Sequence, residues 1–175
     1  MKIASLIVGF LAVASYLICF QLKSGKQIIA CRIFSSLMYV LQYVLLFAFV
    51  GAAMDAAALF TNYIAYKKDT KIVSKYKIPI LIFTNLSIIA VGLLLYENIF
   101  SLLPIAGVIF ESSSSWMKRE KMIRIVSLFA VPCWLIYNLV CGAYASAVGS
   151  VLAFISIISA LIRYRKSEVK SSTET

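Results

Sequence analysis

Residues 63–82 read YIAYKKDTKIVSKYKIPILI, a lysine-rich segment between two apolar runs. Five lysines fall within residues 67–77. A helix needs about 20 mainly apolar residues to cross a bilayer, and short cytoplasmic loops of membrane proteins carry an excess of Lys and Arg. The segment therefore predicts a cytoplasmic loop between two transmembrane helices.

The rest of the chain repeats this alternation of apolar runs and short loops. Working outward, we predict seven spans, at residues 3–20, 27–49, 52–66, 78–96, 99–117, 122–141 and 143–163, with a turn at Gly51. This assignment places sixteen of the seventeen Lys and Arg residues on one side and only Lys2 on the other. We therefore expect the N-terminus outside the cell and the C-terminus in the cytoplasm.

The composition supports an integral membrane protein. The chain is 62% hydrophobic and 14% charged, with a mean hydropathy of +0.95, which excludes a soluble globular domain and a disordered chain. The formal charge of +10 lies beside spans, so the expected partner is the lipid bilayer and not nucleic acid. The apolar run from Ile3 continues past a signal-like Ala12-Val13-Ala14 to Phe20, which favours an uncleaved first span.

Several chemistries lack the residues they need. The chain has no His, and its four cysteines lie in or at the ends of apolar segments without metal-ligand spacing. No nucleotide-binding glycine loop and no pair of intramembrane acids suited to hydrolysis is present. We therefore expect no catalytic residues, no metal site and no cofactor.

The two halves of the chain share one register. When the sequence is displaced by 95 residues, the first three spans overlie the last three without a gap, and Lys23 meets Lys118, Tyr39 meets Trp134 and Lys68 meets Arg163. The prediction is an all-α integral membrane protein with two parallel three-helix bundles joined by a linker helix, an architecture similar to that of the SWEET/PQ-loop transporters. The predicted parts are a transmembrane domain at 1–166, with bundles at 1–68 and 98–166 and the linker at 77–97, and a disordered cytoplasmic tail at 167–175.

A family resemblance is carried by the second half. Residues 102–109 read LLPIAGVI and residues 133–138 read CWLIYN, followed by Gly142, Gly149 and Ile162-Arg163. These residues resemble the YgjV-type bacterial inner-membrane proteins from about Leu102 to Lys166, and the first half agrees in span layout. The resemblance implies a multi-pass protein of the bacterial cytoplasmic membrane and implies little about chemistry.

Glu111 is the first candidate for a functional residue, because polar groups inside a bilayer are costly and usually face the bundle interior. It shares one helix face with Pro104, Gly107 and Ser114. Glu111 is predicted to couple transport to a proton or cation, or to anchor a substrate. The alternatives are an ion pair with Arg124 across the hairpin and a side chain that extends toward the inner loop.

Four further residues complete the predicted substrate site: Trp134, Asn138, Tyr39 and Asn62. An indole above a neutral amide suits an uncharged polar solute, although Asn138 bonded to a neighbouring helix and Trp134 packed in the core are alternatives. Asp55, expected near the outer end, and Asn85, on the linker, are given structural roles. The sequence thus predicts a transporter of a small, uncharged polar solute, and the alternative is a non-transporting assembly partner or regulator.

Overall fold

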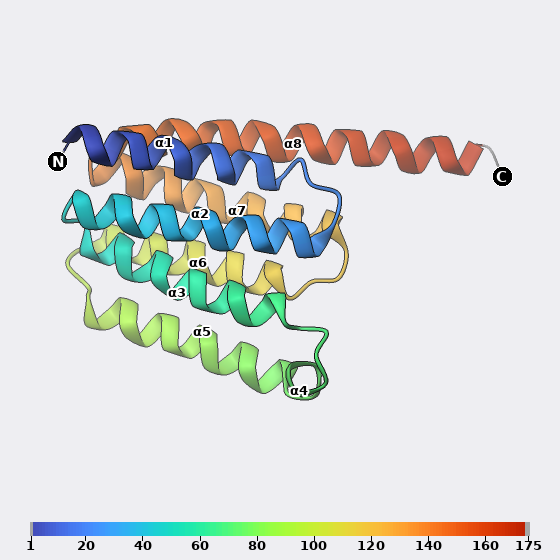
Figure 1. Cartoon of the computed structure of the whole chain (residues 1–175), viewed down its shortest axis with the longest axis horizontal. Helices are drawn as coiled ribbons and strands as arrows, with labels where there is room; N and C mark the ends of the chain where they lie inside the picture. Colours follow the sequence, from blue (N-terminus) through green and yellow to red (C-terminus); the bar gives the residue numbers. More distant parts are fainter. Residues whose placement is uncertain (1, 174–175) are drawn as a thin grey trace.

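The computed structural model describes residues 2–173, with side chains for residues 4–164, and this part of the chain is helical without a strand (Figure 1). The all-α prediction is confirmed. The elements are α1 (Lys2–Cys19), α2 (Gly25–Leu45), α3 (Phe49–Tyr66), α4 (Lys71–Lys75), α5 (Lys77–Leu94), the 3₁₀ turn η1 (Ile99–Ser101), α6 (Leu102–Ser115), α7 (Glu120–Val140) and α8 (Tyr144–Thr173).

Among the described residues, four helices are long and apolar enough to cross a membrane: α2, α5, α7 and residues 144–164 of α8. Residues 4–19 and 99–115 form shorter apolar helices. Helix α3 has 18 residues and carries the buried polar side chains of Asp55 and Asn62, which lower its hydropathy. Seven spans therefore stay a prediction.

Packing follows the same order in the two halves. Helix α2 packs between α1 and α3, and α7 packs between α6 and α8. Contacts of α3 with α6 and of α1 with α8 join the halves, so these helices form a closed ring, and α5 packs outside it against α6 and α3 (Figure 1). A displacement of 95 residues carries α1, α2 and α3 onto α6, α7 and α8, and it carries each contact between neighbouring ring helices onto another such contact. The packing supports the repeat.

The basic loops gather at one end of the ring. The connections from α1 to α2, from α3 to α5 and from α6 to α7 lie at the right-hand end in Figure 1, where α8 also extends. Lys26, in the first turn of α2, and Asp69, in the loop after α3, form an exposed ion pair of 3.2 Å. The Lys68 ammonium donates hydrogen bonds to the carbonyls of Ser115 and Met117 at 2.9 and 2.7 Å, which ties the end of α3 to the end of α6.

The prediction that Gly51 forms a turn is wrong. The turn lies at residues 46–48, with Phe47 at a φ of 59°, and Gly51 is buried inside α3. Its N–H is among those at a helix start that have no partner within the helix, and it donates to the Tyr137 hydroxyl at 2.9 Å. A Cβ at this position would lie 3.0 Å from the Tyr137 ring and 3.1 Å from the Tyr43 ring, so glycine allows the close approach.

The structure also differs from the predicted disordered tail at residues 167–175. Helix α8 continues to Thr173, so residues 167–173 are helical where the sequence predicts disorder, while residues 174–175 lie outside the described part. No Gly or Pro occurs between Ser150 and Thr173. Without a helix breaker, the backbone hydrogen bonding of α8 continues past the apolar segment.

Candidate functional site

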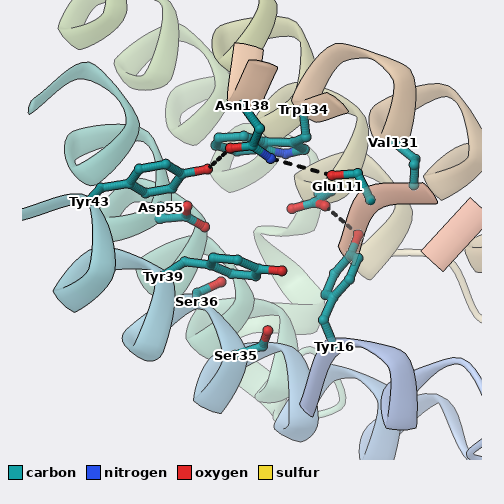
Figure 2. Close-up of a pocket in the computed structure, with 11 residues that line it drawn as sticks. Tyr16, Ser35, Ser36, Tyr39, Tyr43, Asp55, Glu111, Val131, Trp134 and Asn138 are labelled. Carbon is teal, nitrogen blue, oxygen red and sulfur yellow. Dashed lines mark hydrogen bonds between the residues drawn. The ribbon is translucent and has the colours of Figure 1, made fainter. Parts of the chain in front are cut away.

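A polar cavity lies inside the ring, and every ring helix contributes to its wall (Figure 2). The space open to a water molecule is about 30 Å³. One water needs roughly 10–15 Å³ on this measure, so about two or three water molecules fit. A sugar-sized ligand requires the ring to open. The lining residues are Tyr16, Ser35, Ser36, Tyr39, Tyr43, Asp55, Glu111, Val131, Trp134, Asn138 and Ser150.

Ten of these eleven lining residues form five pairs that are 95 residues apart. We call two positions with this separation equivalent. The halves therefore present equivalent positions to the same cavity, which lies where they meet. The pairs are Tyr16 with Glu111, Ser36 with Val131, Tyr39 with Trp134, Tyr43 with Asn138, and Asp55 with Ser150.

Among the described side chains, three hydrogen bonds join equivalent residues directly. Tyr16 Oη donates to Glu111 Oε1 at 2.7 Å, and Tyr43 Oη donates to Asn138 Oδ1 at 2.5 Å. Arg32 Nη2 donates to Ser127 Oγ at 2.5 Å. In a two-fold arrangement a position meets its own equivalent only near the axis. These bonds therefore mark a line along which the two halves face each other.

A reciprocal pair of contacts lies on either side of this line. Ser146 Oγ donates to Gln42 Oε1 at 2.9 Å, and the Gly51 N–H donates to Tyr137 Oη at 2.9 Å. Gln42 is equivalent to Tyr137, and Gly51 is equivalent to Ser146. The contact of α2 with α8 is therefore equivalent to the contact of α7 with α3. The two contacts use different side chains, as expected for a repeat whose halves have diverged.

Glu111 is buried at the cavity and takes its hydrogen bond from Tyr16. Arg124 lies elsewhere, because its guanidinium donates to the Leu22 carbonyl at 2.8 Å and lies 6.0 Å from the centre of the Tyr164 ring. The ion pair of Glu111 with Arg124 that the sequence allows is therefore not formed. Glu111 also does not extend toward the basic loop, because its face of α6 is turned to the inside of the ring.

Arg32 is a buried cation that was not among the predicted site residues. Its guanidinium donates to Ser114 Oγ at 2.7 Å as well as to Ser127, and it lies 5.7 Å from the centre of the Phe20 ring. The signal that could have found it is the register, since a displacement of 95 residues places Arg32 on Ser127.

Asp55 was expected at the outer end of its span, at the level of the lipid headgroups, and given a structural role. The structure places it at the cavity wall instead, so its expected position is wrong. It is 5% exposed, lines the cavity, and points toward the space between Tyr39, Tyr43 and Glu111 (Figure 2). Among the described side chains it has no hydrogen-bond or ion-pair partner. The physical reason is the position of the turn: α3 begins at Phe49, so Asp55 lies about 9 Å along the helix axis at 1.5 Å per residue.

Four of the five predicted site residues meet at the cavity: Tyr39, Glu111, Trp134 and Asn138. Tyr43 continues the aromatic wall, with its ring centre 6.3 Å from that of Tyr39 and 6.2 Å from that of Trp134. Gly107 makes room for the indole, because a Cβ there would lie 2.9 Å from Trp134 Nε1.

Asn62 does not line the cavity. It is buried and accepts a hydrogen bond from Ser115 Oγ at 2.6 Å. Ser115 also receives a hydrogen bond from Arg32 at 3.3 Å. Asn62 thus belongs to the network around Arg32, between the cavity and the basic end. Its predicted place in the substrate site is not supported by this arrangement.

A family model described as a bacterial inner membrane protein, YgjV, matches residues 3–168. The chain belongs to the YgjV family of bacterial inner membrane proteins. The match covers both halves of this YgjV protein, so it extends the resemblance from the second half to every residue of the cavity wall. No curated protein and no solved structure matches the chain. The family and the apolar helices together identify a protein of the bacterial inner membrane that contacts the lipid bilayer.

Proposed function

We propose that this YgjV protein is a multi-pass transporter that moves a small polar solute along a path between two three-helix bundles. The observation that carries the proposal is the polar cavity, whose wall is built from equivalent positions of the two halves. Transporters with internal repeats bind substrates near the membrane midplane at the interface between the repeats. Buried polar and ionisable groups in a membrane protein are costly, and they often mark such pathways. We propose no catalytic role.

The proposed arrangement in the membrane has seven spans: α1, α2, α3, α5, α6, α7 and α8, with α5 as the linker. Segregation of the basic loops to one end of the ring supports it. The excess of Lys and Arg makes that end cytoplasmic. The N-terminus is then outside and the C-terminus inside.

Opening of the ring is required for transport, because the cavity has room for only a few water-sized molecules. The two most extensive helix–helix contacts between the halves, of α3 with α6 and of α1 with α8, are equivalent under the repeat. At the first, Lys68 bonds to the last carbonyls of α6 at the basic end. At the second, Gly149 lies against Val13, where a Cβ would come within 2.4 Å of a Val13 methyl. We propose that these contacts loosen in turn.

The solute that Trp134 and Asn138 predict is uncharged. Asp55 and Glu111 place two carboxyl groups at the same cavity and favour a cationic solute instead. Both classes use the same path, so the transport proposal depends on neither of them.

The test of transport is uptake. A strain lacking the gene is screened over a panel of labelled small solutes, and we expect a defect that the intact gene restores and the Asn138→Ala variant does not. Asn62→Ala is the matched control, because Asn62 is buried but lies off the cavity. The non-transporting alternative is favoured if uptake of every solute is unchanged and the purified protein gives no flux in proteoliposomes.

A further inference from the structure

Asp55 is a buried carboxyl group with nothing in the described structure to hold it. It is 5% exposed, lines the cavity and is directed into it (Figure 2). Within residues 4–164 no side chain or backbone group bonds to it. A buried charge without a partner is strongly unfavourable, and an intramembrane acid usually has a partner in the bundle or in a ligand.

The charges around the cavity do not balance. The wall carries two carboxyl groups, Asp55 and Glu111, and no Lys or Arg. Arg32 lies behind the wall, where Ser114 and Ser127 hold its guanidinium. Ser114 is one turn after Glu111 on α6, so Arg32 is the buried cation nearest to Glu111 along that helix. Lys68 and Arg124 bond to backbone carbonyls at the basic end. If both acids are ionised, one negative charge has no counter-ion among these groups.

The aromatic side chains of the cavity wall also favour a positively charged ligand. The rings of Tyr39, Tyr43 and Trp134 follow one another, with interplanar angles of 25° and 19° between neighbours. The faces of Trp and Tyr attract ammonium groups, and aromatic cages are a common device for binding them. A carboxylate next to aromatic faces suits an alkylammonium ion better than a bare metal ion, which prefers a shell of oxygen ligands.

We propose that the cavity binds a small organic cation of the ammonium type, with Asp55 as its counter-ion and Tyr39, Tyr43 and Trp134 around its alkyl groups. This inference deepens the proposed transport function, because it names the chemical class of the solute. The cavity volume of about 30 Å³ admits methylammonium in the closed form. Larger amines require the ring to open.

Binding is measured on the purified full chain in nanodiscs. The chain has two tryptophans, so in a Trp116→Phe background the fluorescence reports on Trp134 at the cavity. The probes are methylammonium and choline, and their uncharged isosteres methanol and 3,3-dimethylbutan-1-ol, at constant ionic strength. We expect saturable binding of a cation and none of its isostere at the same concentration.

Two substitutions locate the site. Asp55→Asn is expected to raise the Kd for the cation by about tenfold or more. Asp69→Asn is the matched control, because Asp69 is an exposed loop carboxylate paired with Lys26, and it should leave the affinity unchanged. If Asp55→Asn does not fold, Asp55→Glu keeps the charge and should keep the binding.

The proposal is overturned if the uncharged isostere binds as well as the cation, if sodium competes equally, or if folded Asp55→Asn keeps the wild-type affinity. Flux of the same probes in proteoliposomes separates this inference from the transport proposal. Binding without flux contradicts transport and leaves the cation site intact. Flux of an uncharged solute by a protein that binds no cation contradicts the cation site and leaves transport intact.

Discussion

Tyr43 donates a hydrogen bond of 2.5 Å to Asn138, the residue at the equivalent position of the other half. This bond, together with those from Tyr16 to Glu111 and from Arg32 to Ser127, shows how the halves are held face to face. One partner of each bond comes from the first half and one from the second. Loss of the bond from Tyr43 or of the bond from Tyr16 should weaken the contact between the halves and also alter the cavity wall, because the residues of both bonds line the cavity.

Tyr43→Phe tests this contact. It leaves Asn138 Oδ1 without its donor, and we expect a loss of about 0.5–2 kcal/mol in unfolding free energy, the range for hydrogen bonds between membrane helices and for buried groups left unpaired. Thermal unfolding in detergent measures it. Tyr144→Phe is the control, since Tyr144 is 69% exposed. Equal stability of both variants and wild type would show that the bond contributes nothing.

Glu111 and Arg124 are predicted to act independently. Glu111 bonds to Tyr16 and Arg124 bonds to the Leu22 carbonyl, so Arg124→Gln should not rescue Glu111→Gln. The changes in unfolding free energy caused by Glu111→Gln and Arg124→Gln should add up in the double variant. The changes caused by Glu111→Gln and Tyr16→Phe should instead differ from their sum by about 0.5 kcal/mol or more. Rescue of Glu111→Gln by Arg124→Gln would restore the ion-pair interpretation.

Gly107 is predicted to set the position of Trp134. In Gly107→Ala the new Cβ would lie 2.9 Å from the indole Nε1, and overpacking of this kind costs about 1–3 kcal/mol. The emission of Trp134 in a Trp116→Phe background should shift as the indole moves. Gly25→Ala is the control, because its Cβ would meet only Ile123 Cδ1 at 3.6 Å. An unchanged emission spectrum in Gly107→Ala would contradict this packing.

Lys68 is predicted to give a pH-dependent stability. Burial lowers the pKa of Lys68 from its ordinary value of 10.5. The unfolded chain therefore binds more protons than the folded protein between the lowered pKa and 10.5. Stability should rise with pH across that interval. Lys68→Gln should reduce the slope of unfolding temperature against pH relative to wild type. Identical slopes would show that Lys68 titrates alike in both states.

Much of the fold follows from the sequence because apolar runs and basic loops are local properties. The 95-residue register predicted that Tyr39 and Trp134 are equivalent, and both line the cavity. Asp55 and Asn62 were misplaced for another reason. How deep these two side chains lie depends on the turn at residues 46–48, where α3 begins. What they contact depends on which helix packs against each face of α3. The register also did not show that equivalent residues such as Arg32 and Ser127 touch, since contact at an axis is a property of the assembled ring.

The most direct test of the seven-span arrangement, on which the two parallel halves depend, is thiol labelling in intact bacterial cells. Single cysteines replace Phe47, Asn98 and Tyr144 at one end of the ring and Thr70 and Glu120 at the other, in a background without the four native cysteines. Phe47 is used because it is an exposed residue of the turn between α2 and α3. A membrane-impermeant reagent should label the first three positions in intact cells and the other two only after permeabilisation. Labelling of Thr70→Cys or Glu120→Cys in intact cells would contradict the seven-span, N-out arrangement.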